Sequence, residues 1–213
     1  MKLFLSIAIV FLFSMNVFAQ QTIFDAARSG DITTLETILN KDATAVNQQD
    51  SKGYTPLILA VYNNQANAVA YLLEKGANVN AQDYSGNTAL MGTAFKGYTA
   101  IAEKLLAYDA AVAVMNFNQA TALTFAATFG ANDIAALLLA HGANPHTKDT
   151  HGKSALDYAT SQQNNVFVKL VAAQEKNAKK VQAKRVGSYM SNSIKTQDLH
   201  TNKPAPIAGC YMQ

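Results

Sequence analysis

The sequence predicts an all-α solenoid, a stack of short helix pairs, and three observations predict it. The chain has 213 residues, 49% hydrophobic and 15% charged, which is too apolar for a disordered protein. A six-residue motif returns at a constant spacing, beginning at positions 55, 88, 121 and 154, and a pair of leucines follows it in three of its four copies. One such unit cannot bury its own apolar face, so stacked neighbours must share a continuous core.

The first nineteen residues have the features of a secretory signal. Met1-Lys2 precedes an apolar run over residues 3–13, and as a helix this run spans roughly 16 Å, about half of a bilayer's hydrocarbon core. Val17 and Ala19 then place small residues at the −3 and −1 positions of a cleavage site. We therefore expect an exported chain that begins at Gln20 and has no stable membrane insertion. An uncleaved anchor is the less favoured alternative.

The repeated motif begins with Thr or Ser and keeps a Leu at its third position. An Asp or Asn lies five residues before each copy, and the leucine pair lies seventeen residues after the first three. The copies begin at Thr55, Thr88, Thr121 and Ser154, the upstream residues are Asp50, Asp83, Asn116 and Asp149, and the pairs are Leu72-Leu73, Leu105-Leu106 and Leu138-Leu139. A Gly-Ala-Asn turn after the pair recurs at Gly76 and Gly142.

These residues resemble the ankyrin repeat, whose pattern runs Asp-x-x-Gly-x-Thr-Pro-Leu-His-x-Ala, then a second helix with paired leucines, then Gly-Ala-Asp/Asn-Val-Asn. The resemblance covers about residues 22–174. It implies a curved solenoid of about five helix-turn-helix units with β-hairpin fingers along one edge, the first and last units acting as caps. The units span about residues 22–49, 50–82, 83–115, 116–148 and 149–174.

Local chemistry favours the same arrangement. The Thr or Ser at the start of each motif can accept hydrogen bonds from the first free amides of a helix. Pro56 stands at a first helical position, where its missing N–H costs nothing. Leu57 and Ala60 are three apart and share one helix face. Each unit is therefore expected to start a helix at its motif and to pack through that face.

The pattern breaks in four places. Gly92 and Thr93 stand where leucine and alanine are usual, and a glycine inside a helix costs about 1 kcal/mol relative to alanine. Asp109 replaces a helix-ending glycine, and the finger at residues 115–119 lacks its glycine. An additional residue within 42–47 shifts the first unit by one. Drift in a tolerant repeat is the favoured explanation of the breaks in the third and fourth units, and a locally altered ligand surface is the alternative.

Residues 175–213 differ in charge from the repeats. They hold seven Lys or Arg against two acidic residues, a net charge of +5, whereas residues 20–174 hold nine against twelve, a net charge of −3. Residues 175–185 are rich in helix formers and are expected to extend the last helix, with a disordered tail beyond Gly187. A solvated capping helix is favoured over a patch for nucleic acid or an anionic surface.

The sequence offers little chemistry. His141, His146 and His151 are five residues apart, and this spacing does not place them on one helix face as a metal-binding pair requires. The lone Cys210 excludes an intramolecular disulfide and any zinc site built on two thiolates; pairing with another chain is the less favoured alternative to an incidental residue. No nucleophile-elbow, phosphate-loop or metalloprotease motif occurs. We expect no catalytic residue, no metal and no cofactor.

The surface that remains is the one that the resemblance implies for ligands, namely the fingertips and the concave face of the first helices. Aromatic residues are concentrated at these positions, and exposed aromatic residues are typical of interface hot spots. Tyr84 and Phe117 are expected side by side on neighbouring fingers, with Phe95 and Phe129 inside the groove. The candidate partner-binding residues are Lys52, Tyr54, Tyr62, Tyr84, Phe95, Lys96, Phe117, Phe129 and His151.

The resulting hypothesis is a non-catalytic protein–protein interaction module, periplasmic or secreted, monomeric, with another protein as its partner and without nucleic acid. An inhibitor or protective partner of one envelope enzyme is an alternative within the same class. A metal-dependent enzyme is the less favoured alternative from another class. A convergent acid–base pair in a pocket would favour the enzyme, whereas an aromatic binding surface would favour the interaction module.

Overall fold

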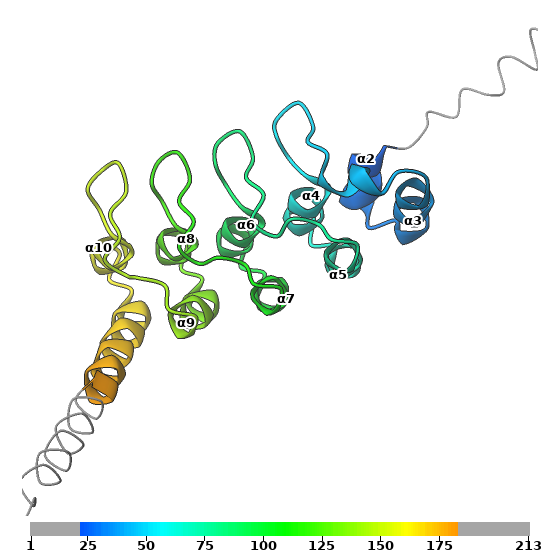
Figure 1. Cartoon of the computed structure of the whole chain (residues 1–213). Coiled ribbons are helices and arrows are strands. Elements are labelled where there is room, and N and C mark those ends of the chain that lie inside the picture. Colours follow the sequence, from blue (N-terminus) through cyan, green and yellow to red (C-terminus); the bar gives the residue numbers. More distant parts are fainter. Residues whose placement is uncertain (1–21, 183–213) are drawn as a thin grey trace, which may run out of the picture. The chain divides into compact units, whose positions relative to one another are not determined.

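The computed structural model describes residues 22–182; the expected signal at 1–19 and the expected tail beyond Gly187 lie outside these residues. The described chain consists of short helices in pairs, joined by tight turns (Figure 1). Their bounds are α2 (Ile23–Ser29), α3 (Ile32–Lys41), the 3₁₀ helix η1 (Ala43–Asn47), α4 (Pro56–Tyr62), α5 (Ala66–Glu74), α6 (Ala89–Lys96), α7 (Thr99–Ala107), α8 (Ala122–Phe129), α9 (Asn132–Ala140) and α10 (Ala155–Ser161). A further helix covers residues 165–182.

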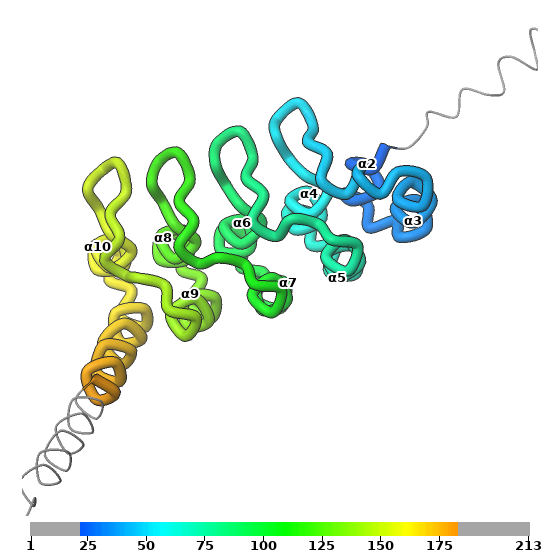
Figure 2. Tube along the Cα trace, viewed as in Figure 1, coloured from blue at the N-terminus to red at the C-terminus, as the bar shows by residue number. Residues whose placement is uncertain are grey.

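The first helices of the pairs form one layer and the second helices form another. In the first layer α2 packs against α4, α4 against α6, α6 against α8, and α8 against α10, while α3, α5, α7 and α9 follow one another in the second. Figure 2 shows that the loops before α4, α6, α8 and α10 project on the same side and lie side by side. Each pair thus packs mainly on its neighbours, which confirms the all-α solenoid.

The helices of the first layer begin where the motif predicts. In each of them the hydroxyl of the preceding Thr or Ser accepts the backbone N–H three residues later, at 3.2–3.3 Å. The capping residues are Thr22, Thr55, Thr88, Thr121 and Ser154. Pro56 occupies the first turn of α4, as expected from its fixed backbone angle.

The core lies between the two layers and continues from unit to unit. The paired leucines of α5, α7 and α9 are all buried. Ala60, Ala126 and Ala159, which occupy the sixth position of their motifs, are fully buried, and such small residues let helices approach closely. Leu72, Leu105 and Leu138 occupy the same position of successive units and are equally inaccessible, so the units contribute equivalent parts of one core.

The loops between the pairs repeat the same backbone conformation whatever residue occupies them. The left-handed position after each first helix falls on Gly30, Asn64, Gly97, Gly130 and Gln163. After the second helices α5, α7 and α9 it falls on Gly76, Asp109 and Gly142, whereas α3 ends at Asp42 in an extended conformation. Asp109, which replaces the helix-ending glycine, therefore keeps the turn with a φ of 61°. The repeat dictates the backbone, and a side chain at this position must tolerate strain.

The fingers are the loops at residues 48–54, 81–87, 114–120 and 147–153. Within the described residues they contain no regular strand; isolated antiparallel bridges join Gln82 to Thr88 and Lys148 to Ser154. The β-hairpin expected for the fingers is therefore reduced to tight turns held by the Asp or Asn that begins each turn. Neighbouring fingers are joined by backbone hydrogen bonds from Tyr84 N–H to the Lys52 carbonyl and from Phe117 N–H to the Ser85 carbonyl.

The structure accounts for two of the breaks in the pattern. The additional residue in the first unit is absorbed by η1, whose first turn is capped by the Asp42 side chain. Gly92 and Thr93 lie within α6 and are buried; the Thr93 hydroxyl donates to the Leu90 carbonyl at 2.7 Å. The ring of Tyr62 lies 3.5 Å from the position that a Gly92 side chain would take. A neighbouring aromatic ring thus covers the surface that a leucine would otherwise cover.

The C-terminal part forms a second compact unit that begins at Lys169. The helix at 165–182 passes through residue 174, so the basic stretch continues a helix as far as the described residues extend. Residues 176–182 are exposed along this helix. Within residues 22–182 no helix has the length and apolar character needed to cross a bilayer.

Candidate functional site

The candidate site is the side of the first helices that meets the fingers, which we call the inner face. Because the repeated units have equal lengths, side chains at equivalent positions lie on the same face of successive helices. Thr128 of α8 lines a hollow that lies beside the fingers, so Thr128 belongs to the inner face. Tyr62 of α4 and Phe95 of α6 occupy the equivalent positions and therefore lie on the same face. The floor of the inner face consists of Tyr62, Phe95, Phe125, Phe129 and Tyr158.

Three of these floor residues form one aromatic cluster. The rings of Phe95 and Phe129 meet edge to face with centroids 4.7 Å apart, and Phe129 stacks on Phe125 at 6.1 Å. Phe95 is 43% exposed and Phe129 is 51% exposed, although both sit at the end of well-packed helices. Aromatic pairs of this geometry gain roughly 0.5–1.5 kcal/mol beyond area burial, so the rings are held in place while much of their surface faces solvent.

Tyr54 and Tyr62 form a second, more buried pair toward the start of the stack. Their rings meet edge to face at 5.9 Å. Burial, together with the nearby carboxylate of Asp83 and the Tyr54 hydroxyl, raises the pKa of Tyr62 to about 12. Tyr62 therefore stays neutral throughout the physiological range and acts here as an apolar surface with a polar tip.

Basic side chains lie over the aromatic floor. The Lys96 ammonium lies 5.4 Å from the centroid of Phe95, and the Lys153 ammonium lies 5.5 Å from that of Tyr158. Neither lysine forms an ion pair with any residue within 22–182. At the other end of the stack, Arg28 donates to Asp25 at 3.1 Å and to Asp50 at 3.2 Å. Along the helix floor, the unmatched cations thus lie toward the later units, while Lys52 on the first finger also has no ion pair within residues 22–182.

The acidic residues of the fingers are engaged within the fold. In each finger one side-chain oxygen accepts two backbone N–H groups of its own turn, at 2.8–3.0 Å. These side chains are Asp50, Asp83, Asn116 and Asp149. They close the finger turns, so they are not free to pair with a basic ligand.

Asp149 has one further contact that the other fingers lack. The Tyr158 hydroxyl donates to its second oxygen at 2.6 Å, and the His151 ring lies 3.7 Å from the same oxygen. Burial alone would raise the pKa of Asp149, but the hydrogen bonds from Tyr158, Lys153 and His151 outweigh it and lower the pKa below its ordinary value. The same bond raises the pKa of Tyr158. Asp149 therefore remains ionised and fixes the position of the Tyr158 ring.

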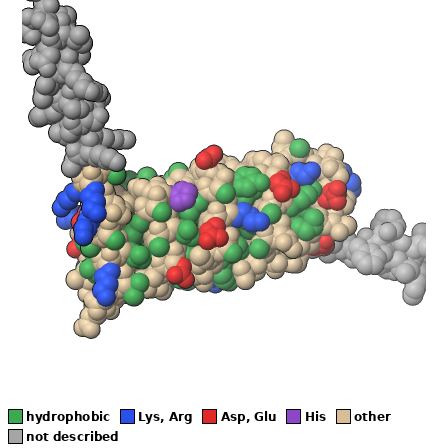
Figure 3. All heavy atoms as spheres, turned by 90° about the horizontal axis from the view of Figure 1, so that it is seen from below, with side chains coloured by type: hydrophobic (Ala, Val, Ile, Leu, Met, Phe, Trp, Pro, Cys, Tyr) green, Lys and Arg blue, Asp and Glu red, His purple; other side chains and the backbone are tan. Residues whose placement is uncertain are grey.

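The side away from the fingers differs in character. Figure 3 shows basic and acidic side chains scattered singly among apolar ones over the second helices. Lys75 lies 5.3 Å from the ring of Tyr71 in α5, and Tyr108 is 42% exposed after α7. Isolated apolar residues of this kind are normal on a protein surface.

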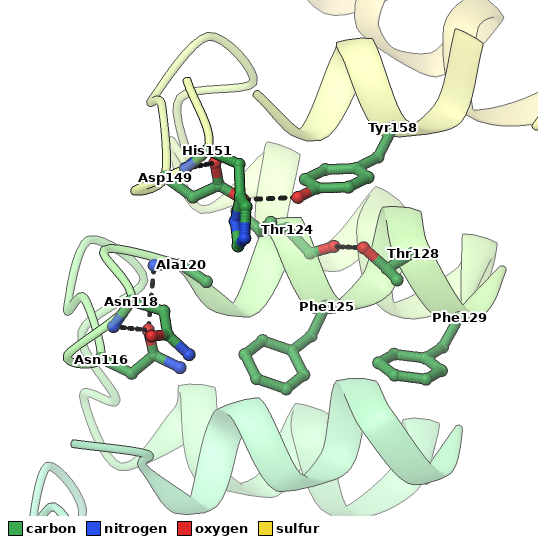
Figure 4. A pocket seen from close by; sticks show the side chains of 10 residues that line it. All are labelled: Asn116, Asn118, Ala120, Thr124, Phe125, Thr128, Phe129, Asp149, His151 and Tyr158. Carbon is green, nitrogen blue, oxygen red and sulfur yellow. Dashed lines mark hydrogen bonds and ion pairs between the residues drawn. The ribbon is translucent and has the colours of Figure 1, made fainter. Parts of the chain in front are cut away.

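A hollow of about 190 Å³ lies between the fourth and fifth units, beside the aromatic cluster. Figure 4 shows its residues: Phe125 and Phe129 come from α8 and lie toward α6, Tyr158 comes from α10, Thr124 and Thr128 lie between them, and the finger side chains lie at one end. The hollow is lined by Asn116, Asn118, Ala120, Thr124, Phe125, Thr128, Phe129, Asp149, His151 and Tyr158. It is smaller than typical cofactor or drug sites, which occupy roughly 300–1,000 Å³.

The fingertip aromatics occupy a separate position. Tyr84 is 63% exposed and Phe117 is 72% exposed. The ring of each lies against the glycine of the preceding finger, Tyr84 on Gly53 and Phe117 on Gly86. Phe117 does not line the hollow, whereas its neighbour Asn118 does. The single apolar strip expected from the sequence is thus built of two parts, a fingertip row and a helix floor.

The remaining candidate residues are distributed over both parts. Lys52 is exposed on the first finger, where its carbonyl accepts the N–H of Tyr84. His151 is exposed and stands at the edge of the hollow. The structure therefore brings together Phe95, Lys96 and Phe129, and separately Tyr54 and Tyr62.

Phe125 and Tyr158 are floor residues that sequence reasoning missed. They occupy the same position of the fourth and fifth units, and the equivalent residue of the third unit is Gly92. Comparing this position across the repeat would have shown two aromatic residues where the unit at 83–115 has none. The position carries no aromatic residue in the family pattern, so the pattern alone gives no sign of it.

Neither a metal site nor an assembled catalytic group was found on the described residues. No group of three His, Cys, Asp or Glu side chains within residues 22–182 is arranged to hold a metal ion. The closest approach to an acid–base set is Asp149, His151 and Tyr158, and there Asp149 is occupied by the finger turn and the Tyr158 hydroxyl.

Comparison with known families gives the same answer as the repeat geometry. The family model for ankyrin repeats, which describes three copies, matches residues 23–116 and again residues 90–183. Ankyrin repeats are generally protein–protein interaction modules, and the family is typically non-catalytic. With the capped helix pairs, the shared leucine core and the row of fingers, this match shows that the chain belongs to the ankyrin repeat family.

Proposed function

We propose that this chain is a non-catalytic module of the cell envelope that binds one partner protein through its inner face and fingertips. The observation that carries the proposal is the pair Phe95 and Phe129, which are fixed edge to face at 4.7 Å and still about half exposed. A rigid aromatic surface loses little conformational entropy on binding, because its side chains are already ordered. Such rings are frequent among the residues that dominate binding energy.

The site of action is the second half of the proposal. The first nineteen residues have the basic start, short apolar run and cleavage-site residues of a secretory signal. We expect fractionation of the source cells to recover a processed chain beginning at Gln20 in the periplasm or the medium, without detergent. A full-length chain in the cytoplasm or the inner membrane would contradict this.

Binding is tested by affinity capture from the soluble envelope fraction with the tagged chain. Phe95→Ala with Phe129→Ala should weaken capture of the main partner about thirtyfold or more, since truncating a hot-spot aromatic typically costs about 2 kcal/mol or more. Tyr108→Ala is the matched control, because it removes an equally exposed ring from the end of a second helix. The control should capture the partner as the unaltered chain does.

Two results would count against the proposed site. One is undiminished capture by a folded Phe95→Ala, Phe129→Ala chain, which would place the contact elsewhere. The other is equal loss in the Tyr108→Ala control, which would indicate that capture reflects general stickiness of aromatic residues. Circular dichroism of each variant establishes that the fold persists.

A further inference from the structure

The hollow between the fourth and fifth units has the dimensions and the lining of a pocket for one side chain. Its volume is about 190 Å³. Phe125 and Phe129 line it from the α6 side of α8, and Tyr158 lines it from α10, with Thr124 and Thr128 between them. A side chain that enters it would meet rings along its edges, which favours an aromatic group.

The polar atoms of the hollow determine which aromatic group fits. Asn116 is engaged, because its carbonyl oxygen accepts two backbone N–H groups and its amide donates to Asn87. The hydroxyls of Thr128 and Tyr158 already donate, to the Thr124 carbonyl and to Asp149, so only their lone pairs remain available. The side-chain amide of Asn118 and the ring of His151 add donors to these lone pairs. The hollow therefore offers polar atoms of both kinds to a ligand, and these match an aromatic side chain with a polar tip, tyrosine or tryptophan.

Unmatched cations flank the hollow on both sides. Lys153 lies over Tyr158 on one side, and Lys96 lies over Phe95 beyond the aromatic cluster on the other. Neither has a carboxylate partner within residues 22–182, while the nearby Asp149 and Asp157 are held by hydrogen bonds of their own turn and helix cap. The electrostatic contribution to binding is therefore largest for a segment that carries acidic residues on both sides of its aromatic residue.

The spacing of these contacts follows from the stack. Lys96 ends α6 and Lys153 precedes α10, so the two lysines are separated by two helix–helix steps. Packed helices lie roughly 8–10 Å apart, which places the lysines roughly 16–20 Å apart along the stack. An extended chain covers this distance in about five or six residues.

We infer that the inner face of units three to five recognises an extended, acidic segment of its protein partner, with a tyrosine or tryptophan seated in the hollow and carboxylates at Lys96 and Lys153. This inference rests on the proposed function and specifies its ligand. It concerns a partner protein, so an acidic segment of unrelated origin that lacks the aromatic residue should bind weakly.

The test selects peptides of about 16 residues, enough for the roughly 16–20 Å span, from a random display library on the chain 20–213. The enriched peptides should share a Tyr or Trp between two acidic residues that are about five or six positions apart. One enriched peptide is then labelled and its affinity measured by fluorescence anisotropy at low and at high salt. Replacing its aromatic residue by Ala should weaken binding about thirtyfold.

Variants of the chain locate the binding. Thr128→Phe fills the hollow with a ring that the repeat already accommodates at the equivalent Phe95 and Tyr62, and it should weaken peptide binding at least about tenfold. Ser161→Phe adds the same ring at the equivalent position of α10 and should change affinity less than about twofold.

The charge contacts have their own matched control. Lys96→Gln with Lys153→Gln should weaken binding about tenfold at low salt and reduce its salt dependence. Lys75→Gln removes a lysine that also lies over a ring, that of Tyr71, but on the second-helix layer, and it should leave affinity unchanged.

The outcomes separate this inference from the proposed function. Enriched peptides without an aromatic residue, peptides rich in Lys or Arg, or affinities that Thr128→Phe does not alter would each overturn the inference. If the envelope partner is still lost in Phe95→Ala with Phe129→Ala, the proposed function stands with a different ligand. If peptides bind as inferred while that variant retains the partner, the proposed function fails instead.

Discussion

The two ends of the inner face treat charge in opposite ways. Near α2, Arg28 is held by Asp25 and Asp50 at 3.1 and 3.2 Å, so its charge is matched within the chain. Near α6 and α10, Lys96 and Lys153 lie over aromatic rings without a carboxylate partner in the described residues. Lys52 on the first finger is likewise unpaired within residues 22–182, so the contrast holds for the helix floor alone. There, repeats with one backbone produce a neutralised end and an open end, and the carboxylates of a partner gain more interaction energy at the open one.

The largest expected effect tests whether the two ends differ only in their surface charge and share an equivalent core. Leu138 and Leu72 are fully buried equivalents from the two ends, and Leu→Ala at either should lower the free energy of unfolding by about 2–5 kcal/mol through lost burial and a cavity. Chemical denaturation measures both. Lys176→Ala, an exposed substitution, should stay within about 0.5 kcal/mol. An unchanged midpoint in Leu138→Ala would contradict the assigned packing.

The next prediction tests whether the partner also contacts the fingertip aromatic residues. Tyr84→Ala with Phe117→Ala should abolish capture of the envelope partner, with a loss of about 2 kcal/mol or more for each hot-spot ring, and should leave the thermal midpoint nearly unchanged. Retained capture would confine binding to the helix floor. Loss of folding, in contrast, would show that the contacts of these rings with Gly53 and Gly86 are structural.

A smaller effect is expected at Gly92, where the two ends meet. A methyl group there would lie 3.5 Å from the Tyr62 ring and the Val61 side chain, which is ordinary contact. Gly92→Ala should therefore raise the free energy of unfolding by roughly 0.5–1 kcal/mol, because alanine favours the helix. The comparison is Gly86→Ala, which should destabilise, since φ is +80° there and the Phe117 nitrogen is 2.8 Å from the added atom.

The smallest effect concerns Tyr62, which belongs to the aromatic pair nearer the neutralised end. Its pKa of about 12 exceeds the ordinary value of 10, so the fold favours the neutral hydroxyl. The stability that Tyr62 contributes is therefore complete below about pH 10 and is lost as the pH rises toward about 12. Tyrosinate absorbance should show one late ionisation near pH 12 that disappears in Tyr62→Phe. An unchanged titration curve in that variant would contradict the assignment.

The fold could be predicted closely from the sequence because the repeat states the same local rule several times. The cap at Thr88, the turn at Gly76 and the pair Leu105-Leu106 each depend on residues within one unit. The site could be predicted only in part. The repeat spacing predicts Phe95 and Phe129 as neighbours. The hollow beside them, however, depends on Thr128 being small where the second and third units carry a ring, and on residues that the neighbouring units contribute to its lining.

The finger at residues 114–120, which lacks the glycine, is a second feature that could not be predicted from one unit alone. Gly53, Gly86, Gln119 and Gly152 are equivalent, and all have positive φ, so glycine is not demanded by the backbone alone. It is demanded at 53 and 86 because the aromatic residue of the next finger lies against it. After Gln119 the next finger carries Thr150 instead, so a side chain fits. The missing glycine at Gln119 is thus compatible with the next finger, because Thr150 stands there in place of an aromatic residue.

Because the residue at the glycine position of one finger must fit the residue of the next finger, only some units can follow one another if the gene is rearranged. Removal of residues 83–115 would bring Phe117 onto Gly53, a junction of the kind that already exists, and should yield a shorter folded protein. Duplication of residues 116–148 would instead bring a second Phe117 onto Gln119, where a side chain occupies the space that the ring needs. Whether two units can be neighbours therefore depends on the side chains at their junction. We expect the protein to tolerate loss of the third unit better than an additional copy of the fourth.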